Sequence, residues 1–109
     1  MSAQIDTLVI TSAGVFTVEV KNWSRQFAGS GEGFNPYEQA SRASYLVYDN
    51  LRQAGLTVKV RTIIVTNGHL PDKREEKVKV LPIGRLRGYI EYFQTAGVNI
   101  NEIRDVLGL

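Results

Sequence analysis

The sequence predicts an α/β domain in which helices flank a mixed β-sheet, and three stretches carry that prediction. Residues 5–23 hold two apolar runs rich in β-branched residues around a short break with a glycine, a pattern typical of a β-hairpin. Residues 36–54 repeat apolar side chains at helical spacing, and residues 57–66 form another β-branched run. This order of strand, long helix and strand indicates a crossover between parallel strands.

Length and composition indicate a single globular domain spanning residues 1–109, with one modest core. Hydrophobic residues make up 43% and charged residues 22%, which is ordinary for such a domain. The chain has no apolar run near the roughly 18 residues of a membrane span, and no signal-peptide pattern. The absence of cysteine excludes disulfides and cysteine-based zinc sites, so we expect a cytoplasmic protein. A net charge of +2 is compatible with nucleic-acid binding but does not indicate it.

Three charged residues are expected to share one face of the hairpin. Side chains alternate along a strand, so Glu19 and Lys21 point to the same side. With a two-residue turn at Ala13 and Gly14, Asp6 lies opposite Lys21 and diagonal to Glu19, roughly 7–8 Å away at the backbone. A three-residue turn would shift the register by one residue and move Asp6 to the other face. The chemistry predicted for this face therefore depends on the turn.

Two interpretations of this cluster follow from the residues. In the first, it is a solvated face with a cross-strand ion pair between Asp6 and Lys21, the commoner origin of so short a pattern. In the second, Asp6 and Glu19 supply the hard oxygen ligands that Mg²⁺ prefers, and Lys21 holds an attacking water or steadies phosphate oxygens. The second strand is apolar on its other face as well, which indicates a central strand where charges need partners or a metal.

The segment after the hairpin and the start of the long helix each allow two interpretations. Residues 24–33 are polar and glycine-rich, as expected for a connector or for a flap over the charged face. Asn35 and Pro36 begin the helix as its cap and first residue. Gln39 and Arg42 lie one turn apart beside the apolar stripe. They are either solvated flanking residues or groups that reach a phosphate or a water.

The C-terminal part predicts three short elements. Residues 78–81 favour a strand, residues 86–94 a helix, and Asn99 caps a last helix. His69, the only histidine, has no histidine partner for a metal and is expected in a loop, and the mixed charges of residues 73–77 are expected to be exposed. We expect Leu86, Ile90 and Phe93 to face inward in the first helix. The second helix carries the apolar residues Ile103, Val106 and Leu107.

The hairpin resembles the core of the PD-(D/E)XK nuclease superfamily, in which an Asp on one strand precedes a (D/E)-x-K on the next. More closely, the Asp6, Gly14-Val15-Phe16 and Glu19-Val20-Lys21-Asn22-Trp23 segments resemble the nuclease-related domain family, NERD. Asn35-Pro36 followed by Gln39 resembles the start of that family's helix. The resemblance covers nearly the whole chain and implies a restriction-endonuclease-like core with a mixed sheet flanked by helices.

The resemblance implies a nuclease that hydrolyses phosphodiester bonds with Mg²⁺ or Mn²⁺, with nucleic acid as partner and DNA as the expected substrate. By position, it implies Asp6 and Glu19, together with Val20, as the metal-holding residues. It implies Lys21 as the catalytic lysine and Gln39 as an accessory active-site residue. The alternative is a catalytically incomplete module that binds nucleic acid or protein on the same scaffold.

Two further expectations concern surfaces. In that family a glutamate-bearing helix and another strand precede the Asp strand, so we expect an N-terminally truncated core whose edge beside residues 5–11 is open. Self-association through this hairpin edge or an uncovered sheet face is then expected. Basic residues are candidates for phosphate contacts, although scattered solvated charge is the alternative. These candidates are Arg42, Lys59, Arg61, Lys77, Lys79, Arg85 and Arg87.

Overall fold

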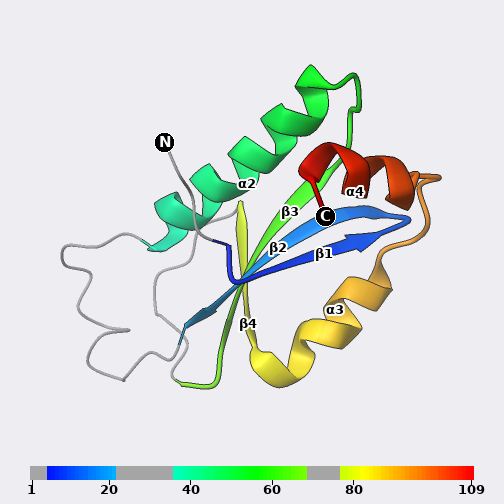
Figure 1. Cartoon of the computed structure of the whole chain (residues 1–109). Coiled ribbons are helices and arrows are strands. Elements are labelled where there is room, and N and C mark those ends of the chain that lie inside the picture. The colour runs from blue at the N-terminus through cyan, green and yellow to red at the C-terminus, as the bar shows by residue number, and fades with distance from the viewer. Residues whose placement is uncertain (1–4, 22–35, 69–76) are drawn as a thin grey trace.

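The computed structural model describes residues 5–21, 36–68 and 77–109, and a four-stranded sheet runs through it (Figure 1). The expectations for residues 24–33, Asn35, His69 and the run 73–76 lie outside the described residues. The sheet order is β1–β2–β3–β4, with β1 antiparallel to β2 and the other two pairs parallel. This mixed sheet confirms the predicted α/β class. The strands are β1 (Thr7–Thr11), β2 (Gly14–Lys21), β3 (Val60–Thr66) and β4 (Val78–Pro82).

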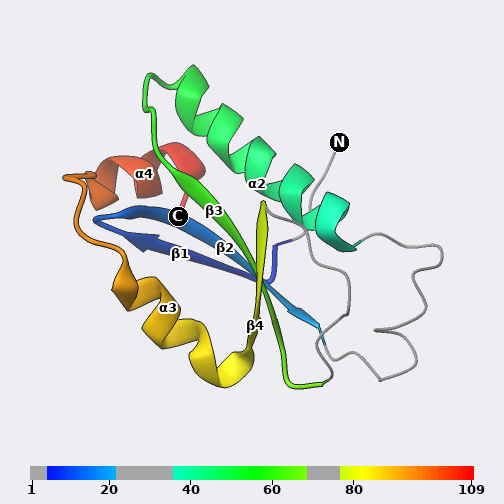
Figure 2. The same cartoon turned by 180° about the vertical axis from the view of Figure 1, so that it is seen from behind.

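Helices cover both faces of the sheet, as Figures 1 and 2 show from opposite sides. Helices α2 and α4 lie on one face and α3, which follows a 3-10 turn, lies on the other. In the described ranges, no helix is both long enough and apolar enough to cross a membrane. The helices are α2 (Pro36–Gln53), η1 (Ile83–Arg85), α3 (Leu86–Tyr92) and α4 (Ile100–Leu107).

The core is divided between the two faces by the alternation of side chains along the central strands. Val15 packs with Val47, Leu51 and Ile103 on the α2 and α4 side. On the other side, buried residues of β2 and β3 pack against half-buried residues of α3. The inward prediction is confirmed for Leu86, Ile90 and Phe93. In α4, Ile103 is buried and Leu107 packs against the same cluster, whereas Val106 is 39% exposed.

The hairpin forms as predicted, but its register differs by two residues. The turn residues are Ser12 and Ala13, because Thr11 already pairs with Gly14. The prediction that Asp6 lies opposite Lys21 is therefore wrong. Since Thr7 pairs with Val18, continuing the ladder by one residue places Asp6 across from Glu19. A two-residue shift keeps every side chain on its predicted face.

The displaced turn has a physical cause in Gly14, which begins β2. A Cβ built on Gly14 would lie 2.6 Å from the backbone oxygen of Lys59, and the glycine has a φ of +132°. The amide of Val15 donates to that same oxygen at 2.9 Å. Glycine is thus required where the backbone of Lys59, just before β3, approaches β2 closely, and not within the turn itself.

Helix α2 is tied to the sheet by three buried hydroxyls. Thr62 Oγ1 donates to Ser44 Oγ at 2.6 Å, and Ser44 Oγ also shares a hydrogen bond with Thr17 Oγ1. All three residues are buried. The three hydroxyl groups satisfy one another's hydrogen-bonding capacity, so they can be buried between α2, β2 and β3.

Candidate functional site

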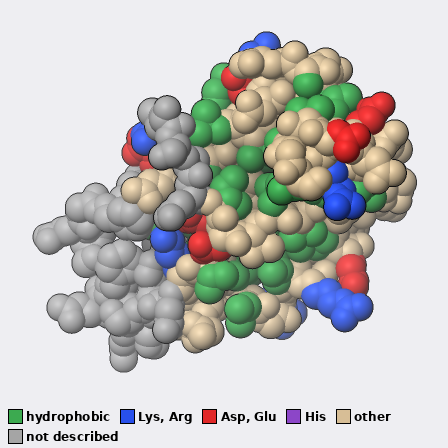
Figure 3. Space-filling view, viewed as in Figure 1, with side chains coloured by type: hydrophobic (Ala, Val, Ile, Leu, Met, Phe, Trp, Pro, Cys, Tyr) green, Lys and Arg blue, Asp and Glu red, His purple; other side chains and the backbone are tan. Residues whose placement is uncertain are grey.

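The predicted carboxylates and lysine come together at the C-terminal end of β2. Glu19 pairs with Ile64 of β3, which packs against α2, so Glu19 faces the α2 side of the sheet. Lys21 lies two residues further along and shares that face. Figure 3 shows a face of the molecule on which acidic and basic side chains lie next to one another.

Glu19 is the most buried member of the group. Its side chain is 14% exposed, and its Oε2 atom is buried without a hydrogen-bond donor among the described residues. The Lys21 Nζ atom lies 3.9 Å from Oε2, an ion pair that is too long for a hydrogen bond. Burial raises the pKa of Glu19 above its ordinary value, Lys21 lowers it by a smaller amount, and Asp6 raises it further.

Asp6 is exposed. Its Oδ2 atom accepts a hydrogen bond of 2.9 Å from the amide of Val20. This N–H points toward β1, where a backbone carbonyl would accept it if the ladder continued. The carboxylate of Asp6 is thereby held beside the end of β2, close enough to Glu19 to affect its pKa.

The two remaining predicted site residues differ in position. The Val20 side chain is 45% exposed and points to the face opposite Glu19, so only its backbone can take part. Its carbonyl lies on the same strand edge as its N–H, beside Asp6. Gln39 lies in the first turn of α2 and is exposed, and the structure gives it no hydrogen bond to Asp6, Glu19 or Lys21 within the described residues.

The donor atoms of this group fit a small divalent cation. Two carboxylates and a backbone carbonyl are hard oxygen ligands, the kind that Mg²⁺ binds while keeping several waters. Glu19 Oε2 is buried and lacks a donor among the described residues, so it could accept a further positive partner. No third acidic, histidine or cysteine side chain joins the group within the part of the chain that the structure describes.

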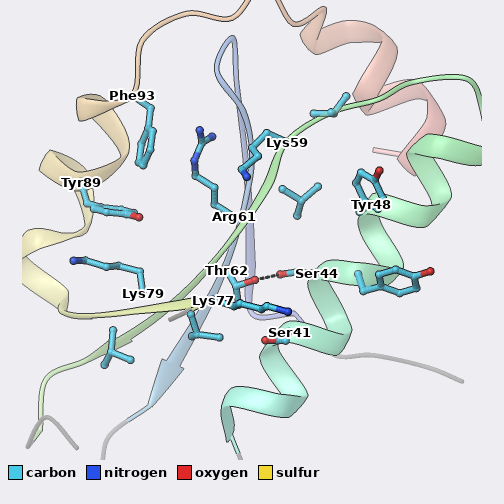
Figure 4. A pocket seen from close by; sticks show the side chains of 15 residues that line it. Ser41, Ser44, Tyr48, Lys59, Arg61, Thr62, Lys77, Lys79, Tyr89 and Phe93 are labelled. Atoms are coloured by element: carbon cyan, nitrogen blue, oxygen red, sulfur yellow. Dashed lines mark hydrogen bonds between the residues drawn. The ribbon is translucent and has the colours of Figure 1, made fainter. Parts of the chain in front are cut away.

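The predicted phosphate-binding residues separate into two sets. Lys59, Arg61, Lys77 and Lys79 line one groove of about 780 Å³ between α2 and α3, at the edge of β3 and β4 (Figure 4). The other three lie outside it: Arg42 pairs with Glu38 at 3.2 Å, Arg87 pairs with Glu91 at 2.8 Å, and Arg85 is exposed in η1.

Sequence reasoning missed the aromatic lining of this groove. Tyr45 and Tyr48 line it from α2, and Tyr89 and Phe93 line it from the α3 side. The signal available in the sequence was the alternation of cations with apolar residues in two strands that pair side by side. It placed the cations on one sheet edge but could not indicate which helices flank them.

Together, the fold and the site define a nuclease-like α/β domain, with two carboxylates and a lysine at the end of a central strand. The nuclease-related domain model matches residues 1–67, more than half of the chain. The chain therefore belongs to the nuclease-related domain family, NERD, as the resemblance of its hairpin predicts. No curated protein and no solved structure is significantly similar to it.

Proposed function

We propose that the chain is a metal-dependent nuclease domain that hydrolyses phosphodiester bonds of nucleic acid, with DNA as the expected substrate. One observation carries the proposal. The buried Oε2 atom of Glu19 has no hydrogen-bond donor among the described residues, faces Lys21 at 3.9 Å, and lies across the hairpin from Asp6. A carboxylate left this way is costly unless a cation completes its surroundings.

The three residues have different roles in this proposal. Asp6 and Glu19 hold Mg²⁺ or Mn²⁺ with the carbonyl of Val20, and the bound ion supplies charge neutralisation and a more acidic water. The hydrogen bond from the Val20 amide fixes the orientation of Asp6 toward the end of β2. Lys21 shares the Glu19 face, so its ammonium group is placed to orient water or to stabilise the negative charge that develops on phosphate oxygens.

Cleavage of labelled single- and double-stranded DNA with and without Mg²⁺ tests the proposal. The wild-type protein should cleave at least one substrate only with metal, and Glu19→Gln should abolish cleavage. Glu91→Gln is the matched control, because it makes the same chemical change at an exposed carboxylate of α3. Cleavage by Glu19→Gln at the wild-type rate would refute the assignment of this site.

The second candidate is a module that binds nucleic acid without cutting it. The groove lined by Lys59, Arg61, Lys77 and Lys79 favours this candidate, because no residue of β1 or β2 lines it. Wild-type protein that binds DNA but leaves it intact with Mg²⁺ and with Mn²⁺ would support this candidate over the nuclease.

A further inference from the structure

The groove between α2 and α3 joins a cationic surface to an open strand edge. It is lined by four cations and, among the described residues, by no carboxylate. Strand β4 pairs with β3 only from Thr62 onward, so Val60 and Arg61 have no strand on that side within the described residues. Cationic side chains and polar backbone groups therefore face the same space, which suits an anionic ligand.

Both walls of the groove also carry aromatic rings. Tyr45 of α2 is 59% exposed and lies 6.4 Å from Tyr48 between ring centroids. On the opposite wall, Lys79 Nζ lies 5.5 Å from the centre of the Tyr89 ring. Figure 4 shows Tyr48 on the α2 side and Tyr89 with Phe93 on the α3 side, with the cationic side chains between them. Exposed rings beside cations are how proteins bind single strands, because bases stack on the rings while phosphates meet the charges.

The cationic side chains of the groove differ in how many contacts they make with the rest of the fold. The Arg61 guanidinium lies 3.9 Å from the centre of the Phe93 ring and donates to the Ala13 carbonyl at 3.4 Å. Arg61 therefore helps to fasten α3 and the hairpin turn, so its removal would alter the fold as well as the charge. Lys59 and Lys79 are exposed, and their replacement tests binding more cleanly.

We propose that this groove binds single-stranded nucleic acid, with Lys59 and Lys79 contacting phosphates and Tyr45 stacking on a base. A volume of about 780 Å³ is that of a small-molecule pocket and admits a short stretch of one strand but not a duplex. An acidic peptide matches the charges but brings no base for the exposed ring of Tyr45. The ligand class rests on the proposed function; the strandedness and the binding residues go beyond it.

The test is fluorescence anisotropy with three labelled probes: a 12-nucleotide oligothymidine, the same sequence as a duplex, and a polyglutamate peptide. All measurements are made in EDTA so that no cleavage occurs. The single strand should bind most tightly. Lys59→Glu and Lys79→Glu should each weaken it about tenfold or more, and each should reduce the salt slope by about 0.7 per lost phosphate contact. Tyr45→Ala should weaken binding about fivefold or more, whereas Tyr45→Phe, which keeps the ring, should bind like wild type.

Arg104→Glu is the matched charge control, since it reverses one exposed charge on α4, away from the groove. It should bind nearly as the wild type does. Equal losses in Arg104→Glu and Lys59→Glu would overturn the proposal, because only net charge would matter. Tighter binding of duplex or of polyglutamate, or no binding of any probe, would overturn it too. Because no metal is present, this result and the cleavage test can fail separately.

Discussion

Glu19→Gln should stabilise the metal-free protein at neutral pH, although it removes a member of the proposed site. The ion pair with Lys21 at 3.9 Å is worth about 4 kcal/mol of attraction at an effective dielectric constant of roughly 20. Burying each charged group costs several kcal/mol. Because burial is the largest influence on the pKa of Glu19 and raises it, the cost exceeds the attraction. We expect a net gain of roughly 1 kcal/mol from the neutral amide.

The raised pKa of Glu19 also predicts how its contribution to stability changes with pH. The native pKa of Glu19 is raised, so between the ordinary value of 4.5 and the native value the folded protein binds more protons than the unfolded chain. The contribution of Glu19 to stability is therefore complete below pH 4.5 and is lost as pH rises through its native pKa. Glu19→Gln should lack this loss of stability. The difference in free energy of unfolding between the variant and the wild type should therefore grow as pH increases.

Thermal unfolding with and without Mg²⁺ measures both effects. A gain of 1 kcal/mol corresponds to roughly 4–8 °C in a domain of this size. At a Mg²⁺ concentration ten times Kd, the wild type should gain about 1.4 kcal/mol, or roughly 6–11 °C, and Glu19→Gln should gain nothing. The control Glu91→Gln should follow the wild type in both respects. The reasoning is refuted if Glu19→Gln is less stable than wild type without metal, or if it keeps the Mg²⁺ response.

Three other outcomes follow from the structure. Lys21→Ala should keep the Mg²⁺-induced rise in melting temperature but lose cleavage, since an ammonium group is no metal ligand; loss of the thermal response would make Lys21 structural. Gly14→Ala should destabilise by roughly 3 kcal/mol in urea unfolding, because its Cβ would meet the Lys59 carbonyl at 2.6 Å; a cost under about 1 kcal/mol would contradict the close approach. The outer edge of β1 (Thr7–Thr11) has no strand beside it among the described residues, so light scattering at tens of micromolar should give a dimer or larger mass, and a monomer would contradict this.

The faces of the hairpin were predictable from the sequence, but its register was not. Alternation of side chains is local, so Glu19 and Lys21 could be assigned to one face without knowledge of the fold. The predicted register is wrong because it places Gly14 in the turn, whereas Gly14 pairs with Thr11. Its true constraint is the backbone of Lys59, which lies 45 residues further along the chain and is invisible to any local pattern.

The groove between α2 and α3 could be predicted from the sequence only in part. Lys59 and Lys79 could be proposed as phosphate contacts because each alternates with apolar residues in a strand. Their common groove also needs the parallel pairing of β3 with β4 and the approach of Tyr45 and Tyr89 from helices on opposite faces. These are long-range arrangements, fixed by packing and not by local spacing.

The hydrogen bonds of Ser44 with Thr17 and Thr62 fix the position of α2 along the sheet. Sliding the helix by one turn, about 5.4 Å, would replace Ser44 with Ala40 or Tyr48 between Thr17 and Thr62. A methyl group leaves both threonine hydroxyls without this partner, and a phenol ring is too large for the space of a serine. The helix therefore has one stable position along the sheet. Its first turn keeps a fixed position relative to the strands, including the one that carries Glu19.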